Sequence, residues 1–185
     1  EKAGAAAISC LTDEHFFGGK LEYIKEIREV VSLPVLRKDF IIDEYQIWEA
    51  RAGGADAILL IAEVLSEGQL MDYMILAHEL RMTSLVEAHS MDELLKIQGH
   101  IGFPHAGYSL LGINNRDLKT MNTDISHTIR MVDVVEDPSI VVSESGISNP
   151  EDLDRLRQHG VHIVLVGESL MKQECPGEAL AKLIR

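Results

Sequence analysis

The sequence is poor in the features that mark membrane and secreted proteins. It has two cysteines, Cys10 and Cys175, which lie far apart and form no C-x-x-C pair. We therefore expect two reduced thiols in a cytoplasmic protein and no disulfide framework. No apolar run approaches the roughly 20 residues that a membrane-spanning helix needs. The first residues lack the basic-then-apolar pattern of a signal peptide and an initiator methionine, so we expect a piece of a longer chain.

Positive charge is also scarce, since 17 Lys and Arg stand against 30 Asp and Glu and give a net charge of −13. Nucleic-acid binding draws most of its affinity from neutralised phosphates, so we expect no nucleic-acid partner. An anionic membrane surface would repel the protein as well. A small anion can still bind where a few cations and backbone N–H groups converge.

Metal-binding patterns are missing too. The eight histidines are scattered, and the sequence has neither H-E-x-x-H nor Cys/His ligand spacing. We therefore expect no metal site. A G-x-S-x-G nucleophile elbow is absent as well, which argues against a serine hydrolase of that type.

What the sequence does contain is a repeated unit of a short apolar segment, turn residues and an amphipathic segment. The apolar segments are nearly continuous in Val, Ile and Leu, which is typical of strands buried on both faces of a parallel sheet. The amphipathic segments begin and end with helix signals: Ser90 with Glu93, Asn149 before Pro150, and Gly54 and Gly160 after helices. The expected strands are 5–11, 34–40, 57–64, 84–89, 110–114, 140–145 and 163–166.

Seven such units predict right-handed βαβ crossovers and a parallel sheet. Two architectures compete, a doubly wound open sheet and a closed (β/α)8 TIM barrel. The dinucleotide-binding open sheet should show G-x-G-x-x-G after its first strand, and this motif is absent. Gly18-Gly19-Lys20 runs into Leu21 and is not a P-loop. A barrel needs eight strands and about 250 residues, so we favour a single, partial barrel domain over residues 1–185 that lacks its first βα unit.

Ionisable residues gather where the expected strands end, which is where barrel active sites are built. Arg37, Lys38 and Asp39 are consecutive, and alternation turns Lys38 away from the other two. Arg37 and Asp39 could pair behind the strand while Lys38 reaches water. We favour a functional Lys38, because a partly buried lysine is readily tuned for proton transfer. Glu87, near the end of another strand, is either a structural carboxylate or the complementary base.

A third strand ends in Asn114-Asn115-Arg116-Asp117. Asn114 is a neutral donor and acceptor, and Arg116 offers a planar fork for a carboxylate or phosphate. The alternative is an Asn-rich turn with Arg116 and Asp117 on the surface.

The last two strands end in small residues before a helical turn, at Ser145-Gly146 and Gly167-Glu168. Barrels commonly bind phosphate at these loops through backbone N–H groups, so we expect an anion there. Phe17, after the first strand, is either a wall for an aromatic ligand or an ordinary loop anchor.

Together these segments resemble the indole-3-glycerol-phosphate synthase family over nearly the whole chain. K-D-F and G-I-N-N-R-D-L, in that order, are the most specific parts of the resemblance. The segments that carry it are 7–13 (A-I-S-C-L-T-D), 16–19 (F-F-G-G), 34–41 (P-V-L-R-K-D-F-I), 55–61 (A-D-A-I-L-L-I), 85–89 (L-V-E-A-H), 112–118 (G-I-N-N-R-D-L), 143–147 (S-E-S-G-I) and 165–171 (L-V-G-E-S-L-M).

The resemblance implies a barrel of the ribulose-phosphate-binding type and a lyase of tryptophan biosynthesis. Its substrate would be 1-(2-carboxyphenylamino)-1-deoxyribulose 5-phosphate, and its products indole-3-glycerol phosphate, carbon dioxide and water, with no cofactor or metal. Lys38 resembles the general acid of ring closure, and Glu87 the carboxylate that handles protons around dehydration. Asn114 and Arg116 resemble the pair that orients the substrate, with Arg116 near its carboxylate. Glu144 resembles a further active-site acid.

The remaining correspondences concern substrate binding. Ser145 and Gly146, with Gly167 and Glu168, match the phosphate loops, and Phe17 matches an aromatic contact to the substrate ring. The expected partner is thus a phosphorylated small molecule, with room for other tryptophan-pathway enzymes or fused domains in a parent chain.

The sequence departs from the family pattern in two places. The opening E-x-K and S-P-S motifs are absent, so we expect these 185 residues, tested alone, to show little or no turnover. Gly99–Tyr108 is longer than the usual link, and a surface loop is expected. Two alternatives remain: a phosphoribosylanthranilate-isomerase-like or other sugar-phosphate barrel, and a non-catalytic phosphate-binding remnant.

Overall fold

The computed structural model describes residues 1–117 and 120–185, so Leu118, the last residue of the G-I-N-N-R-D-L segment, lies outside the described residues. The chain forms two compact units. The N-terminal unit comprises Ala6–Glu87 and Gly99–Leu110. The C-terminal unit comprises Glu1–Ala5, Ala88–Gln98 and Leu111–Arg185.

Strands and helices alternate along the chain, and the strand order follows the sequence. Each of the seven predicted strands is confirmed, most of them with shorter bounds. The strands are β1 (Ile8–Leu11), β2 (Val35–Lys38), β3 (Ala57–Ile61), β4 (Thr83–Ala88), β5 (Ser109–Asn114), β6 (Val141–Glu144) and β7 (Ile163–Leu165). The α-helices are α1 (Glu22–Val30), α2 (Glu44–Gly53), α3 (Glu67–Glu79), α4 (Met91–Ile97), α5 (Ser126–Val132), α6 (Pro150–Gln158), α7 (Glu168–Met171) and α8 (Pro176–Leu183), with short 3₁₀ turns at η1 (Ala106–Tyr108) and η2 (Pro138–Ile140).

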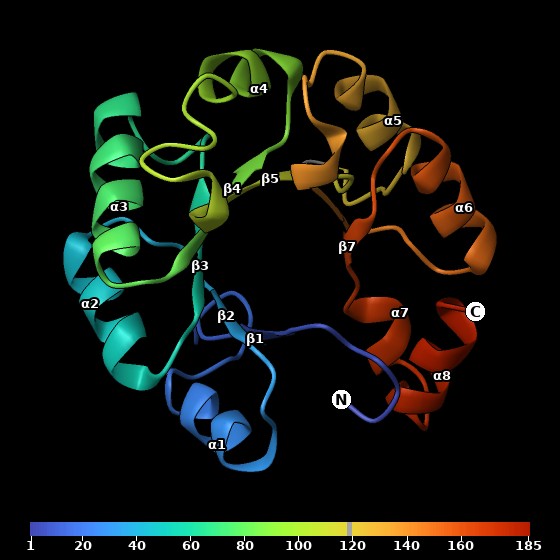
Figure 1. Cartoon of the computed structure of the whole chain (residues 1–185). Helices are drawn as coiled ribbons and strands as arrows, with labels where there is room; N and C mark the ends of the chain where they lie inside the picture. Colours follow the sequence, from blue (N-terminus) through green and yellow to red (C-terminus); the bar gives the residue numbers. More distant parts are fainter. Residues whose placement is uncertain (118–119) are drawn as a thin grey trace. The chain divides into compact units, whose positions relative to one another are not determined.

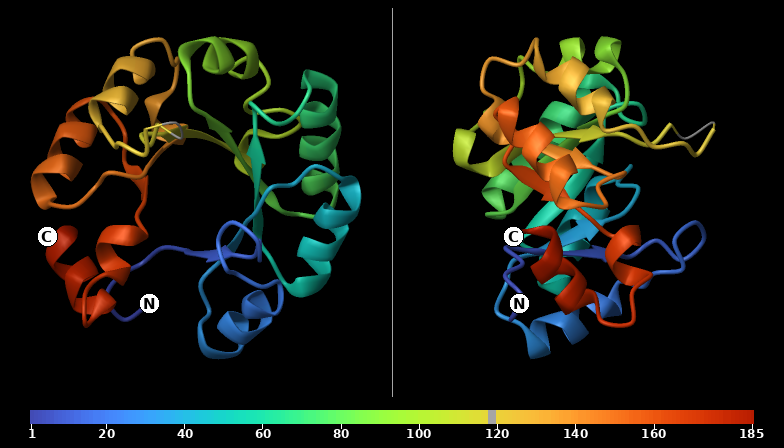
Figure 2. Two further views of the ribbon diagram at one scale, coloured as in Figure 1. Left: turned by 180° about the vertical axis from the view of Figure 1, so that it is seen from behind. Right: turned by 90° about the vertical axis from the view of Figure 1, so that its right-hand side faces the viewer.

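In the N-terminal unit, β1 pairs with β2, β2 with β3 and β3 with β4, all in parallel. Helices α1, α2 and α3 lie along one face of these strands (Figure 1). Ile58 of β3 is fully buried, as are Ile24 of α1 and Ile47 of α2. Burial of consecutive residues in β3 and β4 confirms the prediction drawn from their continuous apolar sequence. Beyond β1 the chain extends as a loop past the strand end (Figure 2, right).

In the C-terminal unit, β5 pairs with β6 and β6 with β7, again in parallel. All four residues of β6 are buried, whereas β7 is partly exposed. Helix α6 begins as predicted: the Asn149 side chain accepts from Asp152 N, the Asp152 side chain completes the capping box, and Pro150 opens the first turn.

One helix signal differs in detail from the prediction, and one apolar helix residue is exposed. Ser90 caps α4 by accepting from Glu93 N, but the Glu93 carboxylate accepts from His89 N at 2.8 Å, one residue before the cap. Val30 of α1 is apolar but 78% exposed. It is the last residue of the helix, beyond the turn whose Ile24 reaches the core.

The long segment Gly99–Tyr108 packs against α3 within the N-terminal unit. His100 Nε2 lies 2.8 Å from Glu67 Oε1. The rings of His105 and His78 stack at 5.8 Å, with Tyr108 edge-on to both. Through these contacts the segment packs on α3, which is a structural role.

Candidate active site

Lys38 and Glu87 meet in the N-terminal unit, each at the carboxyl end of its strand. Lys38 Nζ donates to Glu87 Oε2 at 3.1 Å. The lysine side chain is 16% exposed and the glutamate 4%. Water therefore screens the attraction between the ammonium and the carboxylate little. The pair can both hold a proton at Lys38 and deliver it to a nearby oxygen.

The residues on either side of Lys38 are tied behind β2. Arg37 Nη2 and Nε donate to Asp39 Oδ2 at 2.9 and 3.1 Å, and Arg37 Nη1 donates to the Gln46 carbonyl at 2.8 Å in α2. Thr12 Oγ1 donates to the same Asp39 oxygen at 2.6 Å. Arg37 and Asp39 thus form the structural pair described as one alternative, while Lys38 turns to the other face of the strand and engages Glu87.

Aromatic side chains gather in the loops that follow β1 and β2. Phe17 stacks on Phe40 with ring centroids 5.3 Å apart and planes 7° apart, and Phe16 meets Phe40 edge-on at 5.4 Å. Asp13 Oδ1 accepts from the backbone N–H groups of Phe16 and Phe17 at 2.5 and 3.3 Å. Phe17 remains 42% exposed. The loop thus presents part of an aromatic surface, which suits a flat ligand ring.

Arg116 of the C-terminal unit is held by a carboxylate of the protein itself. Its Nη2 lies 2.5 Å from Glu168 Oε2, and Lys172 Nζ lies 2.6 Å from Glu168 Oε1. The hydrogen bond from Lys172, then that from Arg116, lowers the pKa of Glu168. Asn114 Oδ1 accepts from Arg116 N at 3.0 Å, which fixes the turn after β5.

The Glu168 geometry qualifies the expectation that this residue binds phosphate. A free carboxylate would repel an anion, but both Glu168 oxygens are engaged by cations. Only the backbone N–H of Glu168 is suited to an anion. Arg116 is paired with Glu168, which lies 52 residues further along the chain.

The turn after β6 has an unusual backbone. Ser145 has φ 67° and Gly146 has φ 77°, so both lie in the left-handed region. A Cβ on Gly146 would lie 3.0 Å from Thr123 Cβ, so glycine fits there on two counts. Glu144, the last residue of β6, is 1% exposed. Ser169 Oγ of α7 donates to the Ile147 carbonyl at 2.8 Å, which links this turn to the segment that begins with Gly167.

The sequence reasoning missed Asn115. Its side chain is buried and bonds to Ser143, Thr128 and the Ser145 carbonyl. The second residue of an Asn-Asn pair at a strand end faces away from the first, and that alternation was the signal available in the sequence.

Three further features of the described residues concern metal ligands, cysteines and membrane spans. In that part of the chain, no three His, Cys, Asp or Glu side chains gather as a metal would require. Cys10 is buried, which raises its thiol pKa, and Cys175 is exposed. Over the same residues no helix is long and apolar enough to cross a membrane.

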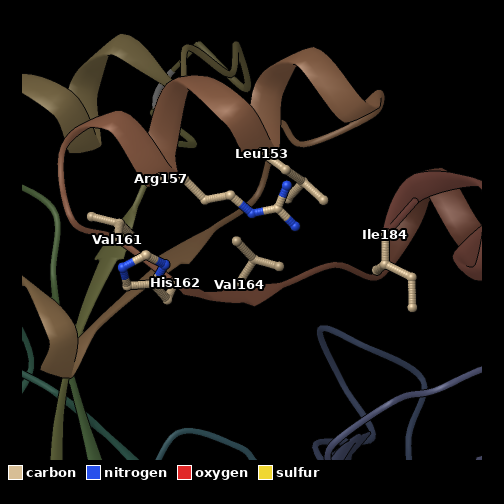
Figure 3. Close-up of a pocket in the computed structure, with 6 residues that line it drawn as sticks. All are labelled: Leu153, Arg157, Val161, His162, Val164 and Ile184. Atoms are coloured by element: carbon tan, nitrogen blue, oxygen red, sulfur yellow. The ribbon is translucent and has the colours of Figure 1, made fainter.

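A cavity of about 100 Å³ lies in the C-terminal unit between α6, β7 and the end of α8 (Figure 3). None of the predicted site residues lines it. Its one arginine is already paired with Asp154 at 2.9 Å, so the cavity reflects helix-on-strand packing. Its lining residues are Leu153, Arg157, Val161, His162, Val164 and Ile184.

Comparison with known proteins gives one family. The family model described as indole-3-glycerol phosphate synthase matches residues 1–183. Proteins of that name are 48% identical over 183 residues in Neisseria gonorrhoeae (strain NCCP11945) and 49% identical over 185 residues in Desulfotalea psychrophila. These alignments cover 99% and 100% of this chain but 68% and 69% of the relatives.

Solved structures agree on the fold. The crystal structure of 3-hexulose-6-phosphate synthase from Salmonella typhimurium superposes with a TM-score of 0.75 at 16% identity, over 95% of this chain and 84% of that one. Identity this low shows the fold alone. With the family match it confirms the predicted fold class, a TIM-barrel-like α/β fold, of which the described residues form seven strands.

Proposed function

This chain belongs to the indole-3-glycerol phosphate synthase family, and on that premise we propose how its residues carry out the reaction. The enzyme acts as a carboxy-lyase on 1-(2-carboxyphenylamino)-1-deoxyribulose 5-phosphate. A carbon–carbon bond forms between the ring carbon that bears the carboxylate and the substrate's ketone carbon. Carbon dioxide and one water then leave, and indole-3-glycerol phosphate remains.

The observation that carries this proposal is the Lys38–Glu87 ion pair at two strand ends. As the ring carbon attacks, the ketone oxygen becomes basic and takes a proton from the Lys38 ammonium. The carboxylate then leaves as carbon dioxide, and its bonding electrons restore the aromatic ring. The new hydroxyl departs as water when it is protonated, and Glu87 accepts and returns protons during this dehydration. The short contact lets the two residues exchange that proton.

The family resemblance gives substrate-binding roles to residues at the ends of β5 and β6. Arg116 receives the substrate carboxylate, for which a guanidinium fork is suited. Asn114 orients the substrate, and Glu144 acts as a further acid. Because Glu168 already neutralises Arg116, an incoming carboxylate must take its place.

The phosphate end is bound at the Ser145–Gly146 and Gly167–Glu168 turns, chiefly by backbone N–H groups such as those of Gly146, Gly167 and Glu168. Gly146 and Gly167 have no side chain, so a phosphate can approach the main chain closely there. Phe17 stacks against the substrate's aromatic ring. We also propose that residues 1–185 act within a single catalytic domain, because the family model spans residues 1–183.

The test is product formation by the protein that contains this chain. Purified protein is incubated with the synthetic substrate, and indole-3-glycerol phosphate and carbon dioxide are measured together. We expect equal amounts of the two products, and loss of both with Glu87→Gln. A folded protein that binds the substrate without releasing either product would instead be the non-catalytic remnant, and an isomerised product would indicate the other sugar-phosphate barrel.

A further inference from the structure

A buried polar cluster lies beneath the turn that follows β6. Asn115, Thr128 and Ser143 are at most 4% exposed, although all three side chains are polar. They come from the end of β5, from α5 and from β6. Burial of polar groups is costly unless each is hydrogen-bonded. The hydrogen bonds of this cluster therefore show what its polar side chains hold in place.

The Asn115 side chain uses all of its hydrogen-bonding capacity. Nδ2 donates to Ser143 Oγ at 3.0 Å and to the Ser145 carbonyl at 3.1 Å. Oδ1 accepts from Thr128 N at 3.0 Å and from Thr128 Oγ1 at 2.8 Å. An amide offers two donors and two acceptor positions. Neither a carboxylate nor an apolar side chain of the same shape could make all four contacts.

The main chain of Asn115 is fixed as well. Its N–H donates to the Glu144 carbonyl at 2.8 Å, and its own carbonyl accepts from Asp124 N at 3.1 Å. One residue therefore bonds both to the last residue of β6 and to the residue after it.

Ser145, the residue after β6, has a backbone conformation that needs support from hydrogen bonds. Ser145 has φ 67°, in the left-handed region that is unfavourable for a non-glycine residue. A strained backbone conformation of this kind persists where several contacts with the surrounding structure hold it in place. The Ser145 N–H makes a long bond of 3.4 Å to the Leu165 carbonyl, whereas the Ser145 carbonyl is held by Asn115 at 3.1 Å.

We propose that Asn115 is a positioning residue that sets the Ser145–Gly146 turn so that the Gly146 N–H faces an incoming phosphate. This inference rests on the proposed function, in which that turn binds the substrate phosphate. It predicts that loss of the Asn115 donors weakens phosphate binding more than it slows the chemical step.

The test uses inorganic phosphate as the probe, with the protein that contains this chain. Phosphate is titrated into the wild type and Asn115→Ala while the backbone amide signals of Ser145 and Gly146 are followed by NMR. We expect about tenfold weaker phosphate binding in the variant, the size of effect that loss of one or two hydrogen bonds brings. For the reaction, KM should rise by a similar factor while kcat stays within about twofold.

Thr128→Val is the matched control, because it removes one hydrogen bond to Asn115 Oδ1 but leaves the bond to the Ser145 carbonyl. It should lower Tm yet keep the phosphate affinity of the wild type. If Asn115→Ala does not fold, Asn115→Asp keeps the side-chain shape and removes the amide donors. Equal phosphate affinity in the folded Asn115 variant and the wild type would overturn the proposal, as would a wild type whose turn amides do not respond to phosphate. Absence of synthase turnover with an intact phosphate response would count against the proposed function alone.

Discussion

The direction in which Lys38 points depends on its neighbours in sequence. Arg37 and Asp39 are both at most 6% exposed and are bonded to each other and to α2 behind the strand. Strand alternation then leaves Lys38 on the opposite face, where Glu87 meets it. The buried pair therefore matters as much for the orientation of Lys38 as for stability.

Arg37→Met should be strongly destabilising. Removal of one partner leaves Asp39 as a buried charge without its counter-ion, which typically costs about 3–5 kcal/mol. Urea unfolding of the wild type and variant measures the difference. Arg28→Met is the matched control, since Arg28 pairs with Asp56 at 2.9 Å but is 39% exposed, and its loss should cost at most about 1 kcal/mol. Equal losses in the two variants would contradict the role assigned to burial.

Glu168 should carry a pH-dependent part of the stability. Its folded pKa lies below the ordinary value of 4.5, chiefly because of Lys172 and then Arg116. The ion pairs therefore stabilise the folded protein fully above that ordinary value, and this contribution is lost as pH falls through the folded pKa. Lys172→Met should bring the pKa of Glu168 back toward its ordinary value. An NMR titration of the Glu168 carboxyl carbon checks this, and an unchanged midpoint would contradict it.

The loop between β1 and α1 depends on one close approach of backbone to backbone. Gly19 N donates to the Asp13 carbonyl at 2.8 Å, and a Cβ on Gly19 would overlap the Leu11 carbonyl and lie 2.8 Å from Thr12 N. This approach closes the loop that carries Phe16 and Phe17, so the aromatic surface depends on glycine at position 19.

Gly19→Ala should destabilise the protein by about 1–3 kcal/mol, as insertion of a methyl group into a filled space does. Gly68→Ala is the opposite case, because a Cβ there meets nothing within 4 Å and the residue lies in α3. It should stabilise by up to about 1 kcal/mol through helix propensity. Thermal unfolding of both variants gives the signs, and a stabilising Gly19→Ala would show that the loop can open without cost.

The elements could be predicted from the sequence because their signals are local. Continuous apolar segments located β3, β4 and β6, and Asn149 with Pro150 located the start of α6. The strand ends were less certain, because residues such as Phe40 stay apolar after strand pairing has stopped. The hydrophobic pattern of a sequence indicates which residues are buried. Apolar residues continue beyond the hydrogen-bonded part of a strand, so this pattern does not show where the strand ends.

The partners of the charged residues could not be read from the sequence in the same way. The sequence marks Lys38 and Glu87 as candidates and the structure shows them in contact, but the sequence does not predict Glu168 as the partner of Arg116. That pairing joins residues 52 positions apart, and it depends on distances that only the fold sets. Alternation separates Asn115 from Asn114, but the partners that bury its amide come from α5 and β6, which a single sequence does not bring together.

At the scale of the whole molecule, fold and chemistry have separate origins. A structure with 16% identity has the same fold, whereas relatives near 48% identity have the family's name as well. A shared barrel does not fix the reaction, which depends on the residues at the strand ends. The net charge of −13 adds a constraint, because an anionic substrate must be bound against the overall charge by a few local cations and N–H groups.

Single-turnover kinetics of Lys38→Ala, in the protein that contains this chain, show whether Lys38 supplies the proton for ring closure as we propose. With Lys25→Ala of the exposed face of α1 as the control, substrate affinity and the rate of the chemical step are measured separately. We predict a rate about 10²–10⁴ times lower in Lys38→Ala, the range typical of a lost general acid, with the substrate Kd nearly unchanged. A chemical step as fast as in the wild type would contradict the account.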